Sequence, residues 1–248
     1  MKSFTAFIAG VGLMGGLAVH CCHAQDREVL LIADPKILAV QIIENKDPMV
    51  DLKQEGKLSY GPSPEIPNNT DYTKLRKTVY EKLLQAQKLL PKGFHFRLYE
   101  GYRSLSLQKM LFDTRFAKVK KQHPDWSEEQ IFNETTRLVS PVTNFDGSKN
   151  VPPHSTGGAV DVYLVNDQGE YVDMGIHPKD WMEDLDGKLS STDSHHISKE
   201  AQVNRKIMSY ALSTVGFINY PTEYWHWSYG DRYWAYYKKN PQAIYGSC

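Results

Sequence analysis

Two segments of this 248-residue chain combine histidine with a carboxylate at short spacing. The first holds His154 and Asp161, with Gly157 and Gly158 between them. The glycines allow the backbone to bend, so that the imidazole and the carboxylate converge on one point. A histidine nitrogen and a carboxylate oxygen are both ligands of zinc, so this segment favours a metal site.

The second segment runs from Glu223 to His226. If residues 225–228 form a strand, His226 points to one face, while Trp225 and Trp227 point to the other. Glu223 stands at the entry to that strand and can lie over whatever His226 binds. The pattern indicates a metal ligand with an acid beside it.

Together the two segments predict a catalytic zinc centre. His154, Asp161 and His226 would supply three ligands and leave one position for water. Glu223 would take a proton from that metal-acidified water, and Arg103 would stabilise the oxyanion that forms on a carbonyl substrate. Each element also has a structural explanation, since packed histidines, strand aspartates in salt bridges and chance Glu-x-x-His patterns are common. The residue types alone leave both interpretations open.

Two strands must deliver these groups. Residues 94–99 alternate like a half-buried strand and run directly into Gly101-Tyr102-Arg103, which would present a fixed positive charge to a cleft. Residues 159–165 form the strand that carries Asp161, with a hairpin turn at 166–169.

Helices are predicted where apolar residues recur at helical spacing. The expected helices cover 72–90, 105–122, a segment after the capping box Ser127-Glu128-Glu129-Gln130, and 199–215, closed by Gly216. Residues 217–220 and 225–228 complete the pattern as short strands. Segregated helices and short strands predict the α+β class: a single domain with a small, mostly antiparallel sheet flanked by helices and a zinc site in a central cleft.

The composition is that of an ordinary globular protein. The 29 Lys+Arg balance 29 Asp+Glu, which argues against a nucleic-acid binder that works through a strong positive field. Hydrophobic residues make up 41% and charged residues 23% of the chain, as in globular proteins. The sequence contains no repeat and no obvious interdomain linker.

The N-terminus has the pattern of a secretory signal. Lys2 precedes an uncharged run over residues 4–19, and small and polar residues follow. We expect a signal peptide at 1–24, cleaved after Ala24, a catalytic domain at 25–248, and a secreted, periplasmic protein. An uncleaved membrane anchor or a lipidated Cys21 or Cys22 are the weaker alternatives. Cleavage would leave Cys248 alone, which excludes an internal disulfide and a cysteine-based zinc site.

The ordered motifs resemble those of the D-alanyl-D-alanine dipeptidases of the VanX type, in the zinc peptidase family M15. That family's Ser-x-His-x-x-Gly-x-Ala-x-Asp, Glu-x-x-His and Gly-Tyr-Arg motifs match at His154, Gly157, Ala159, Asp161, Glu223, His226 and residues 101–103. Further similarity covers Met174-Gly175, Asp180, residues 194–196, residues 200–205 and Gly216-Phe217. Several motifs in the right order are more specific than any one of them.

The resemblance implies the family's mixed α+β fold and one zinc ion per chain. It implies His154, Asp161 and His226 as zinc ligands, Glu223 as base and Arg103 as transition-state stabiliser. By resemblance alone, Asp180 contacts the substrate ammonium, although an exposed loop aspartate is an equal alternative. Trp225, beside His226, is expected to wall the pocket. His195-His196 is expected to be structural rather than a second metal site.

The expected reaction is zinc-dependent hydrolysis of the dipeptide D-Ala-D-Ala to two D-alanines, with no nucleic acid or lasting membrane insertion involved. The alternatives are a D,D-carboxypeptidase or broader dipeptidase acting on peptidoglycan stem peptides, and a zinc-stabilised binding domain without turnover. Two departures bear on the substrate: Pro152 stands where the family motif begins with Ser, and Leu52-Lys53-Gln54-Glu55-Gly56 replaces an aromatic N-terminal segment.

Overall fold

A five-stranded sheet lies at the centre of the structure, a computed structural model that describes residues 29–248. The strand order is β3 (Ser59–Tyr60), β5 (His95–Glu100), β6 (Ala159–Val165), β8 (His226–Ser228) and β7 (Ile218–Asn219). Only β3 and β5 run parallel, and the other three pairings are antiparallel. This confirms the predicted α+β class with a mostly antiparallel sheet. The expected signal peptide, residues 1–24, lies outside the described residues.

Short elements surround the sheet. Helices are α1 (Pro35–Leu38), α2 (Leu52–Glu55), α3 (Lys77–Gln87), α4 (Leu105–Gln122), α5 (Glu128–Thr135), α6 (Lys199–Thr214) and α7 (Arg232–Tyr237). Three 3-10 turns are η1 (Asp71–Thr73), η2 (Pro153–Thr156) and η3 (Pro178–Asp180). Two further strand pairs, β1 (Gln41–Ile42) with β9 (Gln242–Ala243) and β2 (Met49–Asp51) with β4 (Lys74–Arg76), lie outside the central sheet.

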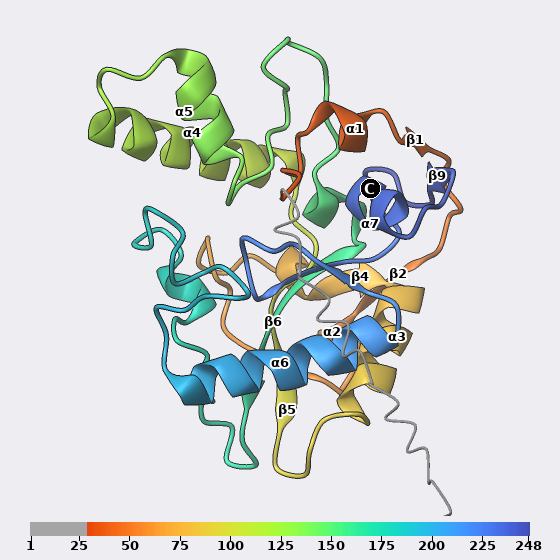
Figure 1. Cartoon of the computed structure of the whole chain (residues 1–248). Coiled ribbons are helices and arrows are strands. Elements are labelled where there is room, and N and C mark those ends of the chain that lie inside the picture. The colour runs from red at the N-terminus through yellow and green to blue at the C-terminus, as the bar shows by residue number, and fades with distance from the viewer. Residues whose placement is uncertain (1–28) are drawn as a thin grey trace, which may run out of the picture.

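The two faces of the sheet have different tasks. On β6, Val160, Val162 and Leu164 enter the main hydrophobic core, whereas Asp161 and Tyr163 point to the opposite face. The core face packs against α3 and α6, which contact each other. Figure 1 shows α6 crossing β5 and β6 on this side. The opposite face is therefore free to carry polar side chains.

The predicted helices are confirmed over most of their length. Helix α4 covers 105–122 as expected, and Ser104 caps its N-terminus. Helix α5 follows Ser127 and has both hydrogen bonds of the predicted capping box. The Ser127 side chain accepts from the backbone N–H of Gln130, and the Gln130 side chain accepts from the backbone N–H of Ser127. In Figure 1, α4 and α5 lie side by side at the edge of the molecule.

One predicted boundary is wrong for an identifiable reason. The helix expected from residue 72 begins at Lys77, because residues 74–76 pair with β2 instead. Leu75 lies opposite Val50 in that pairing, so it is buried as part of a strand rather than of a helix. The hairpin turn predicted after β6 is confirmed, and an antiparallel bridge between Val165 and Tyr171 closes it.

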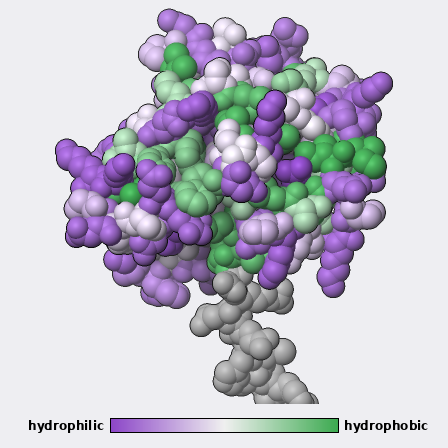
Figure 2. Space-filling view, turned by 90° about the horizontal axis from the view of Figure 1, so that it is seen from above, coloured by the Kyte–Doolittle hydropathy of each residue, from purple (hydrophilic) through white to green (hydrophobic). Residues whose placement is uncertain are grey.

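Hydrophilic side chains cover most of the surface seen from above, with hydrophobic groups between them (Figure 2). Within residues 29–248, no helix has both the length and the apolar character needed to cross a membrane.

Candidate active site

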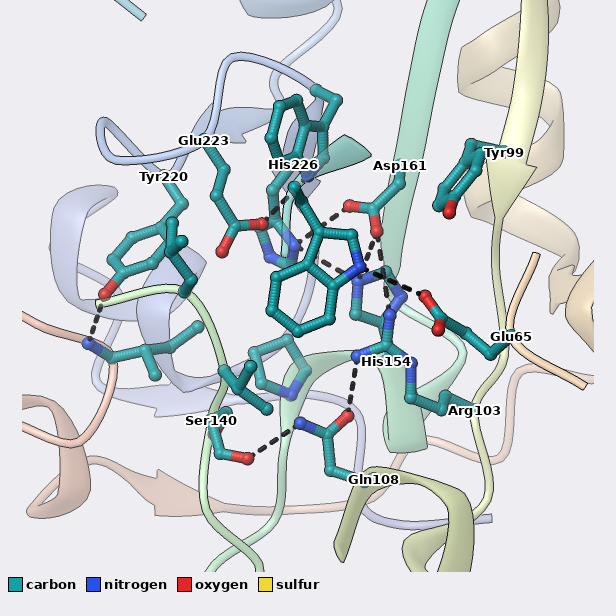
Figure 3. Close-up of a pocket in the computed structure, with 16 residues that line it drawn as sticks. Glu65, Tyr99, Arg103, Gln108, Ser140, His154, Asp161, Tyr220, Glu223 and His226 are labelled. Atoms are coloured by element: carbon teal, nitrogen blue, oxygen red, sulfur yellow. Dashed lines mark hydrogen bonds and ion pairs between the residues drawn. The ribbon is translucent and has the colours of Figure 1, made fainter. Parts of the chain in front are cut away.

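Three buried side chains from the predicted motifs converge on one point. Nε2 of His154 lies 3.1 Å from Nδ1 of His226. Oδ2 of Asp161 lies 3.3 Å from Nε2 of His154, and Oδ1 of Asp161 lies 3.2 Å from Nδ1 of His226. Ligands at zinc bond lengths of 2.0–2.1 Å in a tetrahedral arrangement are about 3.3 Å apart. The spacing therefore fits a zinc ion, and Figure 3 shows the three side chains facing one another.

The hydrogen bonds of the two imidazoles direct their lone pairs to this point. Nδ1 of His154 lies 2.7 Å from the carbonyl oxygen of Gly101, which only accepts, so Nδ1 carries the proton and Nε2 is free. Nε2 of His226 lies 3.4 Å from the hydroxyl of Ser228, which leaves Nδ1 for the cluster. Oδ1 of Asp161 is buried and accepts no hydrogen bond from any described residue. These features are those of a metal site with outer hydrogen-bond partners that fix its ligands.

Strand pairing explains why Asp161 and His226 meet. They lie directly opposite each other in the antiparallel pairing of β6 with β8. Opposite residues of such a pair project from the same face, so both side chains leave the sheet away from the core. The pairing of the two strands thus brings together two residues that are far apart in the sequence.

His154 reaches the same face through a tight turn. It lies in η2, which ends at Gly157 with φ 71°, a left-handed conformation that favours glycine. Gly158 follows, and a Cβ atom there would lie 2.3 Å from the carbonyl oxygen of Tyr229. The two glycines therefore permit the turn and the close approach of η2 to the strand end, as the sequence predicted.

A second turn brings Glu223 to the cluster. The backbone N–H of His226 donates to the carbonyl of Glu223 at 3.1 Å, so the Glu-x-x-His motif folds back on itself. Trp225 donates from Nε1 to Oε2 of Glu223 at 3.0 Å. Strand β8 begins at His226, so Trp225 lies outside it. Trp225 lines the pocket, whereas the expected alternation of the strand would have pointed it away from His226. Both tryptophans belong to the main hydrophobic core, but Trp227 does not line the pocket.

The environment of Glu223 suits a proton acceptor or donor. Burial raises the pKa of its carboxyl group well above the ordinary value, and the nearby Asp161 raises it further. His154, Arg103 and the Trp225 hydrogen bond act in the opposite direction. A carboxyl group with a raised pKa is the form that general acid–base chemistry near neutral pH uses.

Arg103 is buried and held by two partners. Its guanidinium donates to Glu100, with an Nε to Oε2 distance of 3.0 Å, and to Gln108 Oε1 at 3.0 Å. Gln108 in turn donates to the carbonyl of Ser140 at 2.7 Å. One guanidinium nitrogen also lies 3.8 Å from Asp161. The cation is thus fixed beside the cluster.

Contacts with neighbouring side chains outweigh burial at both Asp161 and Arg103. Burial acts to raise the pKa of Asp161, but His154 and His226 together lower it below its ordinary range. Burial acts to lower the pKa of Arg103, but Glu100 keeps it above its ordinary value. These contacts favour the anionic form of Asp161 and the cationic form of Arg103.

The cluster opens into a small pocket. The volume open to the centres of water molecules is about 30 Å³. Besides the residues above, its walls are Ile32, Glu65, Tyr99, Leu138, Val139, Ser140, Pro153, Trp181 and Tyr220. Figure 3 shows Glu65 and Glu223 on opposite sides of the cluster.

Some predicted residues lie elsewhere. Asp180 is exposed and lines a separate cavity between α5 and the 176–189 segment, so the structure does not bring it to the pocket. His195 and His196 are exposed as well. Trp181, the neighbour of Asp180, does line the pocket.

Several pocket residues gave no recognisable signal in the sequence. Glu65 lies in a loop rich in Pro and Asn residues, where no sequence pattern distinguishes a pocket acid from an exposed one. Gln108 is one of several polar residues in α4. Glu100 directly precedes the Gly-Tyr-Arg motif, and that adjacency was the one clue available.

Comparison with known proteins supports the same assignment. A family model described as D-Ala-D-Ala dipeptidase matches residues 68–244. A Synechocystis sp. protein named D-alanyl-D-alanine dipeptidase is 26% identical over 241 residues, covering 84% of this chain and 95% of its own.

Solved structures give weaker matches. VanYB in complex with D-alanine-D-alanine has a TM-score of 0.39 and 18% identity, covering 73% of this chain and 85% of that one. The LD-carboxypeptidase LdcB has a TM-score of 0.37 and 17% identity, covering 81% of this chain and 76% of that one.

Proposed function

The chain belongs to the D-Ala-D-Ala dipeptidase family of metallopeptidases and is a hydrolase, and from this we propose that it cleaves D-alanyl-D-alanine into two D-alanines with the help of zinc. The observation that carries the proposal is the cluster of His154, Asp161 and His226, whose ligand atoms all lie within 4.8 Å of one another. If these three residues only packed in the protein interior, their lone pairs would not need to face a common point.

His154, Asp161 and His226 would hold the zinc ion. When bound, zinc polarises the scissile carbonyl group and lowers the pKa of an attacking water. Two neutral imidazoles and one carboxylate are a ligand set that zinc prefers, and three protein ligands leave a position open for chemistry.

Glu223 is the proposed base. Its carboxylate accepts a proton from the attacking water and returns it to the leaving amine, a relay for which its raised pKa is suited. The hydrogen bond from Trp225 at 3.0 Å holds Oε2 in place and leaves Oε1 free for the proton. Trp225 also walls the pocket on this side.

Arg103 is the proposed stabiliser of the oxyanion. Its position is set by Glu100 and Gln108, so little reorganisation is needed when charge develops on the carbonyl oxygen. Preorganised donors of this kind contribute about 3–4 kcal/mol to the transition state.

A short substrate suits the pocket better than a polymer. The walls that Ile32, Trp181 and Tyr220 form around the cluster favour a free dipeptide. The second candidate is trimming of peptidoglycan stem peptides, which Pro152 keeps open because it removes a hydroxyl from the family motif.

We also propose that the signal peptide 1–24 directs the enzyme to the periplasm. This rests on the sequence pattern at Lys2, residues 4–19 and Ala24. N-terminal sequencing of protein recovered from the periplasmic fraction tests it, with Gln25 as the expected first residue.

One assay separates the two substrates. The purified enzyme is supplied with D-Ala-D-Ala or with a muramyl pentapeptide, and released D-alanine is measured. We expect a higher kcat/KM for the dipeptide. Faster turnover of the pentapeptide would replace the dipeptidase assignment with a carboxypeptidase one, and no release from either would reject the proposed function.

A further inference from the structure

A buried carboxylate close to the metal-ligand cluster has no part in the proposed mechanism. Asp231 is 2% exposed and lies at the N-terminus of α7. Its Oδ1 accepts the backbone N–H of Trp234 at 2.9 Å and so caps the helix. Its Oδ2 is buried and has no hydrogen bond of ordinary geometry with any residue within 29–248. The cap therefore explains one oxygen of this carboxylate and leaves the other without a role.

Capping alone does not account for an acid at this position. Asparagine and serine cap helices about as well as aspartate, and they carry no charge. Burial raises the pKa of the Asp231 carboxyl group, so the anion is unfavourable there. The Trp234 N–H and the Ser228 hydroxyl act to lower this pKa. The imidazoles of His226 and His154 act in the same direction, which means that the metal-ligand cluster helps to offset the cost of the buried charge.

A tight turn brings Asp231 back toward His226. Strand β8 ends at Ser228, and the chain then turns at Gly230, whose φ is 77°. A Cβ atom at Gly230 would lie 2.3 Å from Cδ2 of Tyr245, so only glycine fits this turn without a shift. The backbone N–H of Tyr245 donates to the Gly230 carbonyl at 3.1 Å. The position of Asp231 relative to the strand is thus fixed by packing and by the backbone.

Ser228 contacts both the carboxylate and a metal ligand. It is fully buried, and its Oγ lies 3.4 Å from Nε2 of His226. Within residues 29–248 the hydroxyl has no other hydrogen bond of ordinary geometry. A hydroxyl can accept from one group and donate to another at the same time. It can therefore accept the Nε2–H of His226 and donate its own proton to Asp231.

We propose that Asp231 is a positioning residue for the metal site and orients His226 through the hydroxyl of Ser228. The carboxylate accepts from Ser228, Ser228 accepts from Nε2 of His226, and the Nδ1 lone pair of His226 faces the zinc position. Outer partners of this kind fix the tautomer and the ring orientation of a ligating histidine and raise its basicity. The inference rests on the proposed function, because it concerns the same zinc site.

Asp231→Asn separates positioning from capping. Asparagine keeps a carbonyl oxygen for the helix cap, but its amide nitrogen is a donor where the Ser228 hydroxyl needs an acceptor. The zinc Kd, measured by competition with a chromophoric chelator, should rise by about 10- to 100-fold. After metal removal, the variant should unfold at the same denaturant concentration as the wild type or at a higher one, because an unfavourable buried charge is gone.

Ser228→Ala interrupts the same chain of hydrogen bonds at its middle and serves if Asp231→Asn folds poorly. It should also raise the zinc Kd by about 10- to 100-fold. The double variant should bind zinc no more weakly than the weaker single variant, because both substitutions remove the same interaction.

Asp51→Asn is the matched control. Asp51 also caps a helix, α2, by accepting from the backbone N–H of Lys53 at 3.0 Å, and it does not line the pocket. The substitution keeps a capping oxygen and removes a charge, as Asp231→Asn does, but it should leave the zinc Kd unchanged.

The outcomes are distinct. An unchanged zinc Kd in both single variants, in an enzyme whose wild type binds zinc and cleaves D-Ala-D-Ala, overturns the inference and leaves the proposed function standing. Weaker zinc binding together with easier unfolding of the metal-free Asp231→Asn protein assigns Asp231 to the helix cap alone and also overturns it. Losses that multiply in the double variant show that the two side chains act separately, with the same consequence. A wild type that binds no zinc and hydrolyses neither substrate rejects the proposed function, and the inference falls with it.

Discussion

Glu100 lies directly opposite Asp161 in the pairing of β5 with β6, at a shift in register after Leu98. Without the shift, strand alternation would place Glu100 on the core face beside Leu98. The irregularity turns it to the face of Asp161 instead, where it is fully buried and binds Arg103. A local backbone feature thus sets the position of the cation in the proposed site.

Glu100→Gln should weaken both folding and catalysis. It leaves the buried guanidinium of Arg103 without its main counter-charge, and breaking a buried pair in this way costs about 3–5 kcal/mol. Denaturant unfolding and kcat measure the two effects. Glu134→Gln, in the more exposed pair with Arg137, should cost less than about 1 kcal/mol. Equal effects of both substitutions would contradict the role given to Glu100.

Glu223→Ala should keep the metal and lose most of the activity. Removal of a general base lowers the rate by about 10²- to 10⁴-fold. Elemental analysis and kcat are measured on the same preparation. Normal turnover would remove Glu223 as the base, whereas loss of the metal would show that it acts as a ligand.

His226→Ala should lower the metal content of the purified protein. It removes one of three ligands and leaves a site that binds zinc more weakly. His195→Ala, at an exposed histidine, is the matched control and should retain a full complement. Unchanged metal in His226→Ala, or loss in His195→Ala, would place the metal elsewhere.

Chelation should abolish activity and reduce stability, and zinc should restore both. A ligand that binds only the folded state stabilises it by about 2.7 kcal/mol at a concentration 100 times its Kd. The Tm of the chelated protein is therefore expected to fall and to rise again with added zinc. A Tm that changes neither on chelation nor on addition of zinc would argue against a metal at this cluster.

Gly158→Ala should destabilise the strand end that leads to Asp161. The new Cβ atom would meet the Tyr229 carbonyl oxygen at 2.3 Å, and backbone cannot move aside as a flexible side chain can. Overpacking of this kind costs about 1–3 kcal/mol. Gly61→Ala, whose nearest contact is the Tyr163 hydroxyl at 3.3 Å, should have a smaller effect on unfolding.

The sequence predicted the parts of the site that lie within short motifs. His154 and Asp161 are joined by a glycine turn and a strand, and Glu223 and His226 by one turn, so local rules were sufficient for their arrangement. Their meeting was predictable because strands at 159–165 and 225–228 were recognisable from pattern.

Contacts between distant segments could not be predicted in the same way. At the pocket, Glu65 accepts a hydrogen bond from Trp181, 116 positions away, and no periodicity in the sequence predicts that contact. Trp225 escapes strand alternation because β8 begins one residue later than expected. The sequence pattern does not mark where a strand begins, and a residue outside the strand need not follow its alternation.

Ile32 joins two segments that are far apart in the sequence at the pocket wall. Its backbone N–H donates to the hydroxyl of Tyr220 at 3.3 Å, across 188 positions, and that hydroxyl donates to the carbonyl of Thr136. Such long loops close late, because the entropy of bringing the ends together must be overcome first. During refolding, recovery of enzymatic turnover should therefore lag behind the return of helical circular dichroism.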